Sequence, residues 1–196
     1  MLNNFNKYKN KILLGLALML ILLGNSLEGS QPKTKTIPSL GYNHWLKTFK
    51  QLPEHRKQVA RLIYKNTKGS KIIKYSLVAI SLKESTLGKY MLNINDNKSL
   101  DCGLFQNNVR SVLKREKMKY GKYNQIEVCQ RLLFDTSYSI YHAKQELMYW
   151  KKNRGTWAKA YLSYHRGYKF KSPKGKAYSK DIQVIIEVLK RELFRK

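Results

Sequence analysis

The chain of 196 residues is 42% hydrophobic and 12% aromatic, which is enough to fill the core of one globular domain and excludes a disordered tail or a disulfide-dependent miniature. Its 39 Lys and Arg residues outnumber 12 Asp and Glu residues, and the resulting net charge of +27 favours anionic polymers as partners. Nucleic acid is one such polymer. However, the basic residues are spread from Lys7 to Lys196 without a recognisable reading helix or aromatic RNA-binding motif, so no specific nucleic acid is expected.

The first residues have the pattern of an export signal. Lysines at positions 7, 9 and 11 precede the apolar run Ile12–Leu23, and small residues follow at positions 24 and 26. A helix over this run spans about 18 Å, less than the roughly 30 Å core of a bilayer. We expect residues 1–26 to be a signal peptide, with an uncleaved N-terminal anchor as the alternative. The protein is then exported to the periplasm or cell envelope, and it contacts membrane only through this segment.

A linker and the first helices of the domain follow. Residues 27–40 include the stretch SQPKTKTIPS, which has two prolines and no apolar periodicity, and the folded domain is expected over residues 41–196. The domain begins with two short helical patterns separated by Pro53. A stronger helix is predicted over residues 71–84, where four side chains recur at steps of four, three and four residues and share one face. These side chains are Ile73, Leu77, Ile80 and Glu84.

The remaining sequence predicts a mainly α (α+β) fold. After Gly88 the chain is rich in Asn and Asp, which favours turns and predicts a small β-hairpin near residues 90–106. No other stretch has a convincing strand pattern. Helical patterns, interrupted by Gly155, return over residues 126–150, 157–164 and 181–194.

The two cysteines, Cys102 and Cys129, enclose a loop of 26 residues. In an oxidising compartment they could pair and stabilise the fold by roughly 3 kcal/mol, although the sequence does not show that they meet. They lack zinc-ligand spacing, because there is no CxxC motif and no nearby pair of histidines. We therefore expect no metal site and no cofactor.

Glu84 is the candidate for acid chemistry. Its apolar helix face and the partial negative charge at the helix C-terminus both disfavour the ionised carboxylate, so the pKa of Glu84 is expected to be raised. A protonated carboxyl is what glycosidic cleavage needs, since the leaving sugar must receive a proton. Taken alone, however, Glu84 is better explained as a helix-end residue that extends to solvent or pairs with Lys83 or Lys89.

Four motifs, ordered along the chain, resemble those of the lysozyme-like superfamily, which includes the soluble lytic transglycosylases. The Glu-Ser helix end of the family has its counterpart in Lys83-Glu84-Ser85, and the Gly-Leu-Met-Gln segment in residues 103–106 (GLFQ). The Leu-Phe-Asp that opens the next core helix matches residues 133–135 (LFD), and the Tyr-Asn-x-Gly segment matches residues 164–167 (YHRG). In this resemblance Ile140 faces inward. The similarity covers roughly residues 77–167 and implies a lysozyme-like helical domain with Glu84 as the catalytic acid.

The resemblance also implies roles for further residues. Asp101 and Gln106 match an Asp-x-Gly-x-x-Gln element that animal-type lysozymes and the small transglycosylases of secretion and pilus systems place across the cleft, so Asp101 is expected to face Glu84. Gln106 is expected to bind the sugar or fix the backbone, and the Tyr164 hydroxyl to point at Glu84. His165 stands where the family has Asn, and an imidazole cannot copy both amide hydrogen bonds. The predicted substrate-binding set is Ser85, Gln106, Asn108, Tyr164 and His165.

Two reactions fit this set of residues. A lytic transglycosylase uses one Glu as acid and then as base, so that the C6 hydroxyl of muramic acid closes a 1,6-anhydro ring. A retaining hydrolase adds a second carboxylate before water attacks, a role open to Asp101. We favour the transglycosylase, acting on peptidoglycan glycan strands; a secretion, pilus or phage apparatus is a possible setting that the sequence does not identify. A non-catalytic wall-binding protein and a nucleic-acid-binding protein are the rival classes.

Overall fold

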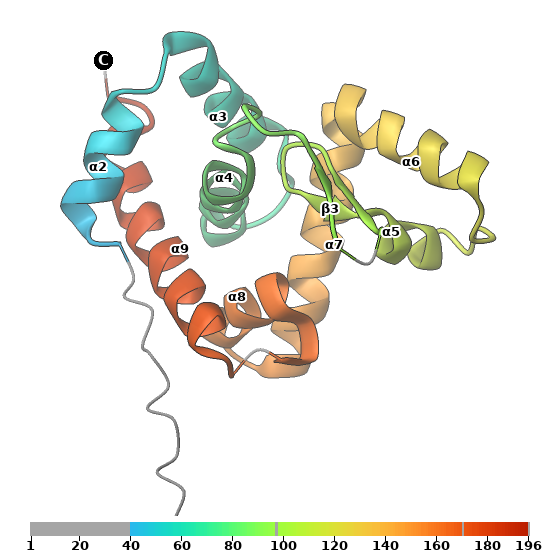
Figure 1. The fold of residues 1–196 in the computed structure, drawn as a ribbon. Coiled ribbons are helices and arrows are strands. Elements are labelled where there is room, and N and C mark those ends of the chain that lie inside the picture. The colour runs from blue at the N-terminus through green and yellow to red at the C-terminus, as the bar shows by residue number, and fades with distance from the viewer. Residues whose placement is uncertain (1–39, 97, 170, 196) are drawn as a thin grey trace, which may run out of the picture. The chain divides into compact units, whose positions relative to one another are not determined.

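The computed structural model describes residues 40–195 except 97 and 170, so the predicted signal segment and nearly all of the predicted linker lie outside the described residues. The described chain consists mainly of helices with one small sheet, as the sequence predicts (Figure 1). The helices are α2 (Tyr42–Lys50), α3 (Glu54–Asn66), α4 (Lys71–Ser85), α5 (Val109–Arg115), α6 (Lys122–Phe134), α7 (Thr136–Arg154), α8 (Trp157–Arg166), the short 3-10 helix η1 (Gly167–Lys169) and α9 (Pro173–Glu192). Within this described part, no helix combines the length and the apolar character that crossing a membrane requires.

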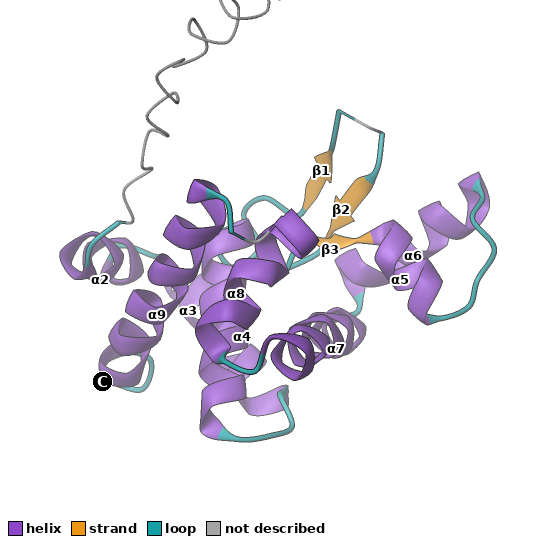
Figure 2. Cartoon of the chain, turned by 90° about the horizontal axis from the view of Figure 1, so that it is seen from below, coloured by secondary structure: helices purple, strands orange, loops and turns teal. Residues whose placement is uncertain are grey.

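The sheet is antiparallel and extends the predicted hairpin by one strand. Its strands are β1 (Leu92–Ile94), β2 (Leu100–Cys102) and β3 (Asn107–Asn108), in that spatial order. Asp101 in the central strand lies opposite Asn93 on one side and Asn108 on the other. Figure 2 shows the sheet between α5 and α6 on one side and the larger group of helices on the other.

Two predicted helix boundaries are wrong. The single helix predicted over residues 126–150 is two helices, because Asp135 has an extended backbone and its side chain accepts a hydrogen bond from Tyr138 N at 2.9 Å, which caps α7. The last helix begins at Pro173, eight residues before the predicted start, with Ser172 as its N-cap. The predicted breaks at Pro53 and Gly155 are confirmed, since α3 begins after Pro53 and α7 ends at Arg154.

Buried apolar side chains form two clusters, one on each side of the sheet. The larger cluster is built around α4, α7, α8 and α9 and includes Leu77, Ile80 and the predicted inward residue Ile140. The smaller cluster packs β2 against α5 and α6. Each fully buried large aliphatic side chain contributes about 1.5–3 kcal/mol, so both clusters hold their helices in place. The C-terminal end of α4 therefore lies at the junction between the larger cluster and the sheet.

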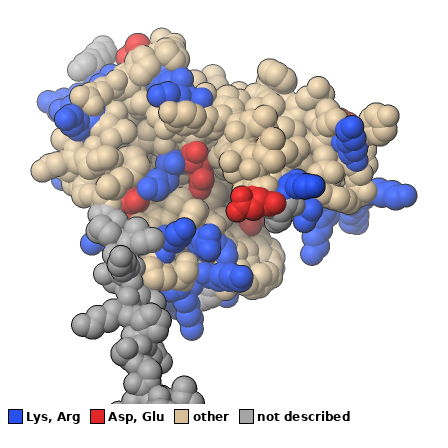
Figure 3. Space-filling model, in the orientation of Figure 1, with Lys and Arg blue, Asp and Glu red and all other residues tan. Residues whose placement is uncertain are grey.

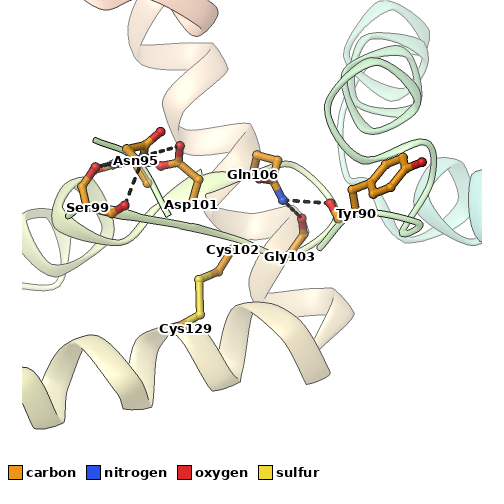
Figure 4. The surroundings of a disulfide bond; sticks show 9 residues. Tyr90, Asn95, Ser99, Asp101, Cys102, Gly103, Gln106 and Cys129 are labelled. Carbon is orange, nitrogen blue, oxygen red and sulfur yellow. Dashed lines mark hydrogen bonds between the residues drawn. A yellow bond between two sulfur atoms is a disulfide. The ribbon is translucent and has the colours of Figure 1, made fainter. Parts of the chain in front are cut away.

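The two cysteines form a disulfide bond, which resolves the alternative that the sequence left open. Cys102 at the end of β2 is bonded to Cys129 in α6 (Figure 4). Both residues belong to the smaller apolar cluster, where Cys102 is fully buried. The bond therefore ties the central strand of the sheet, and with it Asp101, to a helix of the smaller cluster.

Candidate active site

Glu84 lies in the last turn of α4, where the predicted apolar face is buried. Ile73, Leu77 and Ile80 of this face are all buried, and Glu84 itself is partly buried. Loss of hydration raises the pKa of Glu84 from 4.5 to about 7, and the nearby charge of Asp101 acts in the same direction. The Tyr178 hydroxyl and the charge of Lys83 act in the opposite direction. A substantial fraction of Glu84 is therefore protonated at neutral pH.

The backbone that follows Glu84 is strained and held by a neighbouring helix. Thr86 and Leu87 have φ values of 52° and 55°, in the left-handed region that side chains other than glycine rarely adopt. Arg56 of α3 donates hydrogen bonds to the carbonyl oxygens of both residues, each at 3.2 Å. These bonds satisfy acceptors that the helix end leaves free. The turn that ends α4 is consequently fixed, and Glu84 with it.

Ser85 was predicted to bind substrate, but its side chain is fully buried in the structure. Its hydroxyl donates to the Leu104 carbonyl oxygen at 2.7 Å and accepts a hydrogen bond from Gly88 N at 2.9 Å. The first bond joins α4 to the GLFQ segment, and the second closes the turn after the helix. The Glu-Ser pair thus combines a carboxyl at the site with a hydroxyl that connects two parts of the backbone.

Gln106 fixes the backbone of the GLFQ segment, which is one of the two roles predicted for it. Its Nε2 donates to the Tyr90 carbonyl oxygen at 3.0 Å and to the Gly103 carbonyl oxygen at 3.3 Å (Figure 4). Gly103 has a φ of 82°, and a Cβ there would lie 2.3 Å from the Leu132 carbonyl oxygen. Only glycine therefore allows this segment to approach α6 so closely.

Asp101 acts on Glu84 through its charge, and amide groups hold its carboxylate. One oxygen accepts a hydrogen bond from Asn95 Nδ2 at 2.8 Å (Figure 4). The other accepts one from Asn108 Nδ2, also at 2.8 Å. Asn108 also caps α5, since its Oδ1 accepts a hydrogen bond from Ser111 N at 3.2 Å. The two amide donors fix the position of the Asp101 carboxylate, whose charge disfavours ionisation of Glu84.

Tyr164 lies near Glu84, and its hydroxyl was predicted to point at the Glu84 carboxyl. It donates instead to the Phe105 carbonyl oxygen over a long 3.5 Å. Burial and the charge of Glu84 both raise the pKa of Tyr164, so the phenol stays neutral. Tyr164 also lines a cavity of about 310 Å³ together with Gln106 and Asn108. Amide, hydroxyl and aromatic groups line this space together with the ion pair of Arg115 and Glu146.

The sequence prediction missed Tyr178, which α9 brings to Glu84 from 94 residues further along the chain. Its hydroxyl is buried and acts on the pKa of Glu84, yet no hydrogen bond with full geometry satisfies it. Tyr178 lies in the Lys-rich stretch KGKAYSK (residues 174–180), before the predicted last helix, so no local signal indicates that it is buried beside Glu84. The contact depends on how α9 packs against α4.

His165 stacks on the ring of Tyr178, with centroids 4.5 Å apart and planes within 5°. Burial and the charges of Arg166 and Lys83 lower its pKa to about 4, so the imidazole is neutral. Its position beside Tyr178 makes it a support for that ring, although its exposed edge is open to a ligand. Lys83 and Lys89 were the alternative partners of Glu84. Lys83 instead pairs with Asp181, and Lys89 lies against the Tyr90 ring.

The predicted site residues lie around the end of α4, and among them only the side chain of Ser85 is fully buried. Figure 3 shows acidic side chains mostly near the middle of one face, with Lys and Arg around them. A larger cavity of about 610 Å³ lies between α5, α6 and α7, and none of the predicted site residues lines it. We therefore place the site by its chemistry and not by cavity size. A scan of protein-family models and searches of the curated proteins and the solved structures give no match to this chain.

Proposed function

We propose that the chain is a peptidoglycan lytic transglycosylase that cleaves the β-1,4 bond between N-acetylmuramic acid and N-acetylglucosamine. The observation that carries this proposal is the Glu84 carboxyl, which is fixed at a helix end and has a pKa of about 7. A carboxyl with this pKa can both give and take a proton near neutral pH, as an acid that later acts as a base must do. The sequence resemblance of the surrounding motifs supplies the substrate class.

The proposed reaction moves one proton out and back. Glu84 donates its proton to the glycosidic oxygen, the bond between C1 of muramic acid and that oxygen breaks, and N-acetylglucosamine leaves with a free hydroxyl. The C6 hydroxyl oxygen of the same muramic acid then bonds to C1, and its proton returns to Glu84. No water is consumed. Asp101 favours the first step because its charge helps Glu84 keep a proton, and it stabilises the positive charge that develops on the sugar.

Hydrolysis by a lysozyme-type muramidase is the second candidate. The observation in its favour is that Asp101 lies close enough to raise the pKa of Glu84, which puts two carboxyls with different environments in one site. Against a nucleophilic Asp101, Asn95 and Asn108 occupy both of its oxygens with hydrogen bonds. In this second mechanism Asp101 stabilises the sugar cation while water attacks C1.

Digestion of purified peptidoglycan tests the proposal. The wild-type chain is expected to release 1,6-anhydromuropeptides, and Glu84→Gln to release none, because the amide cannot transfer the proton. The matched control is Glu187→Gln, which removes a carboxylate from an exposed position of α9. Products heavier by one water would favour the muramidase. Wall cleavage that survives in Glu84→Gln would refute Glu84 as the acid in both mechanisms. No cleavage by the wild type would favour a non-catalytic role, for which polyanion binding is the second readout.

A further inference from the structure

A buried ion pair stands directly beside Glu84. Lys83, its neighbour in the chain, places Nζ 2.8 Å from Oδ2 of Asp181 in α9. The two side chains are 25% and 4% exposed. A pair that is this far removed from water keeps more of its electrostatic effect than a surface pair. Because Lys83 is the chain neighbour of Glu84, the charges of this pair act close to the proposed catalytic acid.

Asp181 is held rigidly by groups other than Lys83. Its Oδ1 accepts hydrogen bonds from Leu40 N at 2.7 Å and from Trp45 Nε1 at 3.2 Å. Lys83 Nζ also lies 5.0 Å from the centre of the Trp45 ring, a cation–π distance. One oxygen of Asp181 therefore anchors the carboxylate to the start of the domain, while the other is left for the ammonium group of Lys83.

The charge of Lys83 opposes the protonation of Glu84, because a positive neighbour favours the carboxylate. Asp181 places a negative charge against it and offsets this effect. Of the other groups, Tyr164, Tyr178 and His165 are uncharged near neutral pH. The titratable and charged side chains around Glu84 and Tyr164 are Arg56 on α3, Lys83 on α4, Asp101 on β2, Arg115 on α5, Glu146 on α7, Tyr164 and His165 on α8, and Tyr178 and Asp181 on α9.

We propose that Asp181 is a positioning residue for the reaction: it holds and neutralises the ammonium group of Lys83, so that Lys83 neither pairs with the Glu84 carboxyl nor favours the loss of its proton. This inference rests on the proposed function of Glu84 as the acid. Asp181 itself touches no substrate, and its effect reaches Glu84 through Lys83.

Two substitutions with opposite expected signs test the proposal. Asp181→Asn can keep both hydrogen bonds through its Oδ1, yet it turns an amide NH2 toward Lys83 and leaves that charge uncompensated. The pKa of Glu84 should then fall by about one unit. Lys83→Met keeps an apolar chain over Trp45 and leaves the charge of Asp181 uncompensated, so the pKa of Glu84 should rise. The double variant should return close to the wild-type value, and Lys83→Arg should preserve it.

The readout is the carboxyl ¹³C titration of Glu84 in the full chain, with its resonance assigned by its loss in Glu84→Gln. The matched control pair is Lys190 and Glu187 on α9, whose Nζ–Oε1 distance is also 2.8 Å but whose side chains are 47% and 57% exposed. Lys190→Met and Glu187→Gln make the same charge changes and should leave the titration of Glu84 unchanged.

The outcomes separate the inference from the proposed function. Opposite shifts in the two variants support the role of Asp181. Shifts of the same sign, or none in a variant whose thermal unfolding shows that it is folded, overturn that role and leave the pair purely structural. If one variant fails to fold, the other still decides through its predicted sign. The titration does not depend on catalysis. Wall cleavage by Glu84→Gln would therefore refute the proposed role of Glu84 as the acid, while the electrostatic result for Asp181 would stand.

Discussion

Replacement of Glu84 by Gln should stabilise the protein at alkaline pH and leave it unchanged at acid pH. Glu84 titrates near pH 4.5 in the unfolded chain and at about 7 in the folded one. Because the folded pKa is raised, the wild-type chain has its full stability below pH 4.5 and loses it as pH rises through 7. At about 1.4 kcal/mol per pKa unit, the loss is about 3 kcal/mol, and a neutral Gln avoids it.

Urea unfolding of both chains at intervals between pH 4 and pH 8.5 measures this difference. All groups other than Glu84 titrate in both proteins, so their contributions cancel when the two free energies of unfolding are subtracted. The difference should be near zero at pH 4, grow through the interval and level off above pH 7.5. Glu187→Gln, at an exposed position of α9, should give no such curve. A difference between wild type and Glu84→Gln that is constant with pH would refute the raised pKa and the acid role built on it.

Three further substitutions test the surroundings of the site. Gly103→Ala should lower the free energy of unfolding by about 3 kcal/mol, because φ is 82° and the new Cβ would lie 2.3 Å from the Leu132 carbonyl oxygen. The control is Gly121→Ala, whose new Cβ has no atom within 4 Å and which should change the free energy of unfolding by less than about 0.5 kcal/mol. Cys102→Ala combined with Cys129→Ala should lower it by about 3 kcal/mol, and reductant should have that effect on the wild type but not on the variant. Tyr178→Phe should raise the pKa of Glu84 above about 7, because the hydroxyl that it removes stabilises the carboxylate form in the wild type. An unchanged ¹³C titration of Glu84 would contradict this contact.

Local patterns in the sequence were sufficient for the fold class and for the position of Glu84. The steps of four, three and four residues from Ile73 to Glu84 predict a shared helix face, and the structure buries that face. Pro53 marks a helix boundary because its ring fixes φ and it has no N–H, and Gly155 marks one because it adopts a φ of 78°, which other residues rarely do. The apolar pattern continues across Asp135 and did not indicate a boundary there, whereas the resemblance of residues 133–135 to the Leu-Phe-Asp that opens a core helix implied one, and the structure has α7 begin after Asp135.

The sequence by itself thus determined what depends on residues close together in the chain: the helices, the hairpin and a carboxyl at the end of an apolar face. Only the tertiary structure decided which distant groups surround that carboxyl. Tyr178 and Asp181 reach the end of α4 because α9 packs beside it, and Ser85 turns inward because the GLFQ segment supplies a carbonyl oxygen. The raised pKa of Glu84 follows from this packing, since loss of hydration depends on every element that covers the carboxyl and not on its own helix alone.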